Sequence, residues 1–204
     1  MAKPKVRELG EAFRALIKGP YTTKYPFKPP HISKNFRGKP EFNEKDCIGC
    51  GACTFVCPPS ALSFSDKKIN NTYFREMKLD LSKCIFCGQC ELNCITQNGI
   101  HLTQEFDLSS FNREELLRYL QKKLVVCEIC GSIIAPEDQI KWIAEKIGSA
   151  AFSNPTLMLS YLKDLNLVDE KALTEGEPFR QRHSRIRILC PNCRRETTLE
   201  IYYH

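Results

Sequence analysis

The amino-acid sequence predicts an α+β protein of two parts, each organised around closely spaced cysteines. Twelve cysteines occur among 204 residues, and all of them lie in runs or pairs whose members are separated by two or three residues. Strand-like segments separate the first two runs, and helical patterns separate the last two pairs. Such tight spacing suits metal ligation better than a scattered disulfide framework, and it indicates a reducing compartment.

Residues 1–40 differ from the rest of the chain in charge. They contain ten Lys or Arg and two Glu, a surplus of eight, whereas the whole chain has a formal net charge of +6. Val6, Leu9 and Phe13 recur at helical spacing, which predicts an amphipathic helix that stops at Gly19-Pro20. The prolines that follow predict an extended arm: Pro26, Pro29, Pro30 and Pro40.

Eight cysteines form two runs with the same spacing, C-x2-C-x2-C-x3-C: Cys47, Cys50, Cys53 and Cys57, then Cys84, Cys87, Cys90 and Cys94. This is the spacing of bacterial ferredoxins with two [4Fe-4S] clusters, in which the fourth cysteine of a run ligates the other cluster. Cluster one is therefore predicted to bind Cys47, Cys50, Cys53 and Cys94, and cluster two Cys84, Cys87, Cys90 and Cys57. Two zinc knuckles are the alternative, but four-coordinate zinc gives no reason for a third and a fourth cysteine in each run.

The residues around these runs fit a ferredoxin-like domain, with one irregularity. Gly49, Gly51 and Gly88 let backbone amides approach cluster sulfur. Strand-like residues 61–64 and 72–81 predict a hairpin between the runs, around a polar turn at 66–71. After Cys94 the next apolar position comes one residue later than after Cys57. We expect Asn98-Gly99 to form a tight turn that absorbs the extra residue.

A second metal site is predicted from two C-x2-C pairs near the end of the sequence: Cys127, Cys130, Cys190 and Cys193. Although 59 residues separate Cys130 from Cys190, four thiolates that meet would hold one ion with tetrahedral geometry. Zinc is the favoured ion and iron, held as in rubredoxin, is the alternative. Four reduced thiols without metal are a further alternative. The part from Cys127 onward has ten basic and eleven acidic residues, so no nucleic-acid partner is expected.

These features divide the chain into four predicted parts. Residues 1–40 are a helix and docking arm, 41–108 a two-cluster ferredoxin domain, 109–126 a connecting helix, and 127–204 a four-cysteine domain of zinc-ribbon or rubredoxin type with a helical insertion. Asn112 and Glu115 form the capping pattern that predicts the connecting helix. Within the last part, helical patterns follow Pro136 and Asn154-Pro155, and residues 197–203 have strand character.

The order of these features resembles a known family. The arm contains Gly19-Pro20, Tyr25-Pro26-Phe27 and Phe36-Arg37-Gly38, and the runs read Cys47-Ile48-Gly49-Cys50-Gly51-Ala52-Cys53 and Cys84-Ile85-Phe86-Cys87-Gly88-Gln89-Cys90. Together they are similar to chain I of complex I and to its counterpart in membrane-bound [NiFe] hydrogenases. The C-terminal cysteine pairs are similar to those of the small two-cluster subunit of formate hydrogenlyase and of other energy-converting hydrogenases, which favours that branch.

This resemblance implies an electron-transfer subunit without catalytic residues of its own. Electrons would pass from a donor module, which is ferredoxin, formate dehydrogenase or carbon monoxide dehydrogenase, to the small subunit of the hydrogenase. The implied partners are the hydrogenase small and large subunits, membrane subunits and the donor protein. A complex I chain, a freestanding ferredoxin and an iron–sulfur regulator with a zinc ribbon are the alternatives.

The sequence has no signal-peptide pattern and no run of about 20 apolar residues. We therefore expect a cytoplasmic protein without a transmembrane segment of its own, held peripherally on the cytoplasmic face of the membrane by a complex.

Overall fold

A computed structural model describes residues 6–19, 22–70, 72–165, 167 and 187–202, and the chain divides into compact units of residues 1–36 and 37–204. In the first unit, helix α1 spans Val6–Lys18 and has no buried side chain. The Gly19 amide donates to the Ala15 carbonyl at 2.9 Å, and Gly19 has a φ of 72°, so glycine ends the helix in a left-handed conformation. None of the helices in the described ranges has both the length and the apolar character needed to cross a membrane.

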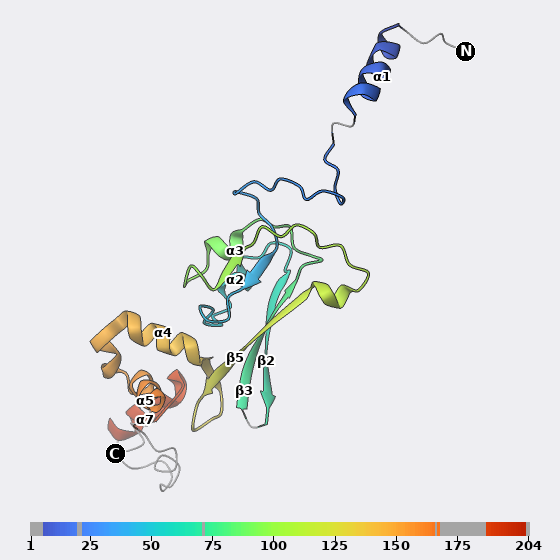
Figure 1. Ribbon diagram of the computed structural model, residues 1–204. Coiled ribbons are helices and arrows are strands. Elements are labelled where there is room, and N and C mark those ends of the chain that lie inside the picture. The colour runs from blue at the N-terminus through green and yellow to red at the C-terminus, as the bar shows by residue number, and fades with distance from the viewer. Residues whose placement is uncertain (1–5, 20–21, 71, 166, 168–186, 203–204) are drawn as a thin grey trace. The chain divides into compact units, whose positions relative to one another are not determined.

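The second unit is organised around an antiparallel sheet in the order β2-β3-β5-β6. Figure 1 labels the first three of these strands. Its strands are β2 (Leu62–Ile69), β3 (Thr72–Asp80), β5 (Leu117–Val126) and β6 (Ile133–Pro136). The short strands β1 (Pro40–Phe42) and β4 (Ile100–Leu102) form a separate antiparallel pair. This pair places the segment before the first cysteine run beside the segment after the second.

The predicted hairpin between the cysteine runs is present as β2 and β3, but its first strand is longer than expected. Polar residues that we assigned to the turn continue the ladder instead, because they pair with opposite charges across it. Arg75 binds Asp66 through two nitrogens at 2.8 and 2.9 Å, and Lys67 binds Glu76 at 2.5 Å. Opposite charges that face each other on neighbouring strands stabilise a hairpin.

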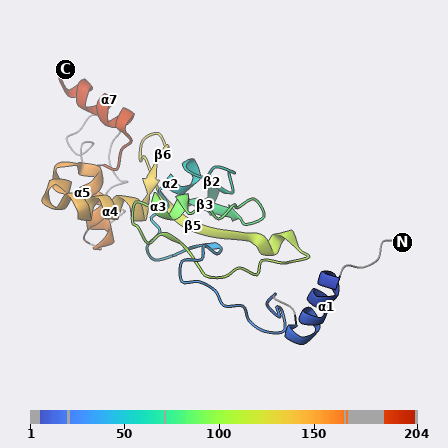
Figure 2. The same cartoon turned by 90° about the horizontal axis from the view of Figure 1, so that it is seen from above.

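Helices occupy two regions of the second unit. Two short helices, α2 (Ala52–Phe55) and α3 (Gln89–Leu92), lie within the cysteine runs. The C-terminal part contains α4 (Glu137–Ile147), the 3-10 helix η2 (Gly148–Ser153), α5 (Pro155–Asp164) and α7 (Pro191–Tyr202). Helices α4 and α5 follow Pro136 and Asn154 as predicted, and Figure 2 shows them beside one another. The Asn154 side chain caps α5 by accepting from the amides of Thr156 and Leu157.

The predicted connecting helix over residues 109–126 is wrong. Asn112 does cap a helix, because its side chain accepts from the Glu114 amide at 3.0 Å, but that helix is the single turn η1 (Arg113–Leu116). Strand β5 follows at once. Its buried leucines, Leu120 and Leu124, are four residues apart, a spacing that fits both a helical face and one face of a strand. Pairing with β3 along seven register positions decides between the two readings.

The strand character assigned to residues 197–203 is also wrong, since α7 covers these positions up to Tyr202 and residue 203 lies outside the described ranges. Pro191 begins the helix, where proline has no amide to leave unpaired. The Thr197 hydroxyl donates to the Cys193 carbonyl at 3.0 Å. This bond gives the buried hydroxyl a partner within the helix. The second cysteine pair therefore opens a helix rather than a strand.

The sheet packs one face against a core that includes cysteine. Its buried members are Cys53, Leu62, Met77, Leu79, Leu81, Cys90, Ile100 and Leu120. A second, smaller core contains Cys127, Leu189, Cys190 and Cys193. Each core is thus built partly from predicted metal ligands.

The strand assignment of β5 predicts unequal effects of two neighbouring substitutions. Leu120 is 7% exposed and faces the core, whereas Tyr119 is 53% exposed on the opposite face. Leu120→Ala should lower the free energy of unfolding by about 2–5 kcal/mol because it leaves a cavity. Tyr119→Ala should cost no more than about 1 kcal/mol. Urea unfolding of the metal-loaded protein, followed by circular dichroism, measures both. Equal losses would contradict the alternation of buried and exposed residues.

Candidate metal centres

Two cavities in the second unit are lined by the eight cysteines of the two runs. The first has a volume of about 340 Å³, including its opening to solvent, and is lined by Cys47, Cys50, Cys53 and Cys94. The second has a volume of about 350 Å³, measured in the same way, and is lined by Cys57, Cys84, Cys87 and Cys90. Each cavity takes three cysteines from one run and one from the other, which is how the ferredoxin spacing divides them. All eight are free thiols, so the donor set fits two [4Fe-4S] clusters.

The two cavities lie on one core. Cys53 belongs to the first cavity and Cys90 to the second, and both are members of the buried cluster around Met77 and Leu79. Helices α2 and α3, which carry these two cysteines, contact each other. Groups bound in the two cavities would therefore be neighbours.

Left-handed backbone positions shape both runs. Gly49 and Gly51 have φ values of 67° and 79°, and Gly88 has 78°. Phe86 stands in the second run where Gly49 stands in the first, and it adopts a φ of 54° although it is not a glycine. A bulky residue in this region is strained, so the surrounding run must impose the conformation. Nothing in the sequence pattern distinguished Phe86 in this way.

The tight turn after Cys94 comes earlier in the chain than we expected. Ser60 and Gln97, each three positions after the fourth cysteine of its run, both have positive φ, and their amides donate to the carbonyls of Cys57 and Cys94. Both runs therefore end in the same kind of turn. Its left-handed residue is Ser60 in the first run and Gln97 in the second, so the turn after Cys94 is not formed by Asn98-Gly99. The extra residue follows that turn. It brings Gly99 against the first cavity, where a Cβ would lie 3.2 Å from Cys94 Sγ.

Burial dominates the electrostatics of the cluster cysteines. It raises the pKa of Cys53 to about 12 and that of Cys90 to about 11, and it also raises the pKa of Cys47, where the nearby Lys122 ammonium opposes the rise. Burial acts in the same direction on Cys94, but hydrogen bonds to Thr96, Gly99 and Ile100 outweigh it and lower the pKa of that thiol. Because thiolate is the form that binds metal, cluster assembly must displace protons from buried sulfur.

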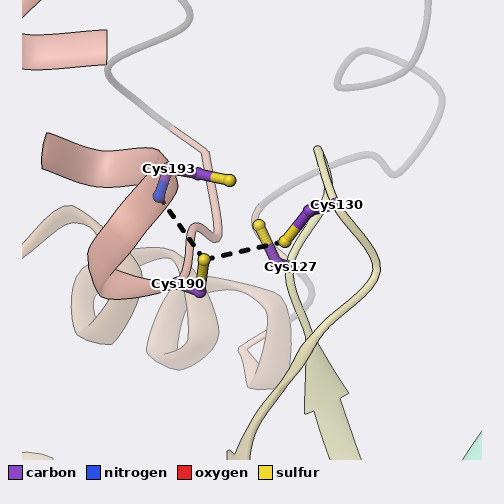
Figure 3. Close-up of side chains that lie close together, drawn as sticks. All are labelled: Cys127, Cys130, Cys190 and Cys193. Atoms are coloured by element: carbon purple, nitrogen blue, oxygen red, sulfur yellow. Dashed lines mark hydrogen bonds between the residues drawn. The ribbon is translucent and has the colours of Figure 1, made fainter. Parts of the chain in front are cut away.

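The four C-terminal cysteines converge on one point from two elements (Figure 3). Cys127 and Cys130 lie in the connection between β5 and β6, and Cys190 and Cys193 lie at the start of α7. Their sulfur atoms are all within 4.8 Å of one another, and Cys130 Sγ is 3.7 Å from Cys190 Sγ. Tetrahedral ligation at a metal–sulfur distance of about 2.3 Å separates ligand sulfurs by roughly 3.8 Å. The thiols thus fit a single tetrahedral ion.

Local hydrogen bonds favour thiolate at part of this group. The Cys193 amide donates to Cys190 Sγ at 3.5 Å, and this bond, with help from Ser132, lowers the pKa of Cys190 to about 6. Cys190 immediately precedes α7, where helix amides stabilise negative charge. Hydrogen bonds from Ser132 likewise lower the pKa of Cys130, whereas burial raises that of Cys193. Sequence reasoning did not foresee the role of Ser132.

In the part of the chain that the structure describes, this is the one group of three or more His, Cys, Asp or Glu side chains that could hold an ion together. The cysteines of the two runs line two cavities instead. That contrast suits a multinuclear cluster in each run and a single ion at the C-terminal group.

Comparisons with known proteins agree with this arrangement. Residues 46–98 match the model of a 4Fe-4S dicluster domain. Formate hydrogenlyase subunit 6 of Escherichia coli (strain K12) is 31% identical over 124 residues, which cover 61% of this chain and 67% of the relative. The chain belongs to this family of iron–sulfur subunits.

Members of the family also occur under another name. NAD(P)H-quinone oxidoreductase subunit I of Gloeobacter violaceus is 32% identical over 53% of each chain. NADH-quinone oxidoreductase subunit I 2 of Geobacter metallireducens is 28% identical over 61% of this chain and 98% of the relative. A chain of an archaeal respiratory membrane complex, the membrane-bound sulfane sulfur reductase, has 27% identity and a TM-score of 0.40, over 57% of this chain and 61% of that one. The family membership makes this chain an iron–sulfur electron-transfer subunit.

The close approach of Gly99 to the first cavity predicts a selective effect of one methyl group. In Gly99→Ala, the new Cβ would lie 3.1 Å from Cys47 Cα and 3.2 Å from Cys94 Sγ, so it would press on two predicted ligands of one cluster. We expect loss of up to about half of the iron and acid-labile sulfide. Asn98→Ala, at the exposed neighbour, should keep the full content. Full content and unchanged spectra in Gly99→Ala would contradict the geometry.

The C-terminal thiols predict one metal ion per chain in addition to about eight iron and eight sulfide from two [4Fe-4S] clusters. Anaerobic metal analysis of Cys127→Ala/Cys190→Ala should show loss of the additional ion with sulfide unchanged. Ser132→Ala retains all four sulfurs and should retain the ion. An ion that stays in the double variant would have to bind elsewhere.

Proposed function

We propose that this subunit relays electrons through two [4Fe-4S] clusters from a donor protein to the small subunit of a membrane-bound [NiFe] hydrogenase. The observation that carries the proposal is the division of eight cysteines into two cavities on one core. Iron–sulfur clusters held by thiolates exchange single electrons. The chain contributes the cysteines that hold the clusters, the core that keeps them adjacent, and the surface that meets the partners.

In this proposal the ligands are assigned by cavity. Cys47, Cys50, Cys53 and Cys94 hold cluster one, and Cys84, Cys87, Cys90 and Cys57 hold cluster two. Because each run contributes to both cavities, the clusters cannot move apart without breaking ligation. A fixed short separation is what a two-step electron relay requires.

The C-terminal site supports the hydrogenase branch. Cys127, Cys130, Cys190 and Cys193 would bind zinc, with iron as the alternative, in a structural role, since four protein sulfurs leave no open position for substrate. The family resemblance assigns such cysteine pairs to the formate hydrogenlyase branch. The second candidate, chain I of a complex I-type oxidoreductase, is favoured by the two quinone oxidoreductase relatives and differs only in its partners.

The first 40 residues are proposed to dock the subunit onto the membrane-associated complex, on its cytoplasmic side. Phe27 in the arm is exposed. So are the large apolar side chains of α1: Val6, Leu9, Phe13, Leu16 and Ile17. A cluster of exposed large apolar residues marks an interaction surface. The surplus of positive charge in this segment would complement acidic partner surfaces or anionic lipid headgroups.

Deletion of residues 1–36 tests the docking role and the partner together. The deletion stops there because the Gly38 and Lys39 amides donate to the carbonyls of Thr103 and Glu105, so the segment from Arg37 onward belongs to the cluster-binding unit. The full chain should co-purify anaerobically with the hydrogenase small and large subunits. The deleted chain should lose that association and keep both clusters.

Four results would oppose the proposal in different ways. Unimpaired association after deletion, or loss of the clusters, would contradict the docking role. Co-purification of the full chain with NADH dehydrogenase subunits would favour the complex I reading. Fewer than about four sulfides in the full chain would contradict the two-cluster relay itself.

A further inference from the structure

A row of charged side chains crosses the sheet beside the first cysteine run. Asp66 on β2 lies opposite Arg75 on β3, and Arg75 lies opposite Lys122 on β5. Residues opposite each other on neighbouring strands point to the same face. The Lys122 ammonium binds Asp138, in the first turn of α4, at 2.8 Å. The signs along the row are therefore negative, positive, positive and negative.

Lys122 is buried between two leucines on the core side of β5 and reaches the first cysteine run. A Cβ on Gly49 would lie 3.1 Å from the Lys122 stem, so the glycine allows the run to rest on it. The ammonium donates to the Glu44 carbonyl at 2.6 Å. We call residues 44–51 the first loop. Lys122 thus binds this loop through the backbone oxygen of Glu44.

Arg75 holds the same loop from the neighbouring strand. Its Nη1 donates to the Gly49 carbonyl at 3.2 Å, and its guanidinium lies 4.4 Å from the centre of the Phe64 ring. That ring packs so closely on Gly51 that a Cβ there would lie 2.9 Å from it. Two cations therefore grip the loop that supplies Cys47 and Cys50 to the first cavity.

The two cations of this row act on the first loop more directly than the two carboxylates do. The side chains of Arg75 and Lys122 are 12% and 10% exposed, whereas those of Asp66 and Asp138 are 21% and 43% exposed. Water screens the more exposed charges better. Both cations contact the loop directly, because each donates a hydrogen bond to one of its backbone carbonyls. Like charges on adjacent strands repel, and Asp66 and Asp138 offset part of this repulsion.

The second loop, residues 84–88, has a weaker counterpart among the described residues. Arg37 donates to the Cys87 carbonyl at 3.2 Å, but Arg37 is exposed. Lys39 is buried next to Pro40, which lines the second cavity, but its ammonium pairs with Glu105, which lies outside the second loop. Lys122, although it pairs with Asp138, also donates directly to the backbone of the first loop. The positive environment of the two cavities is thus unequal.

We propose that Arg75 and Lys122 set the order of the two reduction potentials, with that of the first cavity's cluster above that of the second. This inference rests on the proposed function. Uptake of one electron from the reduced donor protein adds one negative charge and needs no proton. Buried positive charge stabilises the reduced state more than the oxidised state, and thereby raises the potential. An electron delivered to the subunit would then reside mainly at the first cavity.

Redox titration of the full chain, loaded with both clusters and followed by electron paramagnetic resonance, tests this order. Lys122→Gln and Arg75→Gln should each lower the higher of the two potentials and leave the other in place. Asp138→Asn keeps the lysine but removes its counter-charge, so it should raise that same potential. Arg37→Gln should act on the lower potential instead, and more weakly.

Lys123→Gln is the matched control. Lys123 is the next residue on β5, has the same charge, and is exposed on the opposite face. It should move neither potential. Equal shifts in Lys123→Gln and Lys122→Gln, or unmoved potentials in the Lys122, Arg75 and Asp138 variants, would overturn the proposal.

Iron and sulfide content separates this proposal from the proposed function. If Lys122→Gln loses its clusters, Arg75→Gln and Asp138→Asn still decide the question, since each leaves the lysine in place. A full chain that binds no clusters contradicts the relay. Full content with unmoved potentials contradicts only the role of the two cations.

Discussion

Buried cysteine sulfur is the constraint on which the second unit depends. Cys53 and Cys90 lie inside the main core, where burial raises the pKa of their thiols to about 12 and 11. In that environment an isolated thiolate is unfavourable, and a metal–sulfur bond supplies the charge that the core does not. The smaller core repeats the arrangement with Cys127, Cys190 and Cys193 around Leu189. Metal binding at these cysteines would therefore be coupled to folding in both places.

Strand β5 connects these two cores. One of its edges pairs with β3, whose residues Met77 and Leu79 pack beneath the cluster cavities, and the other pairs with β6. The connection from β5 to β6 carries the first C-terminal cysteine pair. The C-terminal site is thus attached to the same sheet that supports the clusters, and not to a separate domain joined by a flexible helix.

The parts of this structure that the sequence predicts are those with a single physical solution. Cysteine spacing leaves few ways to surround a cluster, and it anticipated both cavities and the C-terminal group. Asn154 before Pro155 specifies a helix start for similar reasons. The four-residue spacing of Leu120 and Leu124 has two solutions, and only the long-range pairing with β3 selects the strand. The role of Lys122 is set by neighbours distant in sequence, Glu44 and Asp138, so no local pattern reveals it.

The alternation of side chains along β5 restricts how this family can change length. One residue inserted before Lys122 would turn every following side chain to the other face, so that leucines would meet water and exposed residues would enter the core. Two inserted residues would restore the faces but would move the lysine away from its position opposite Arg75. Among related sequences, insertions and deletions should therefore be rarer in β5 than in the connections around it. The length and register of β5 thus fix the spacing between the two cysteine-containing regions.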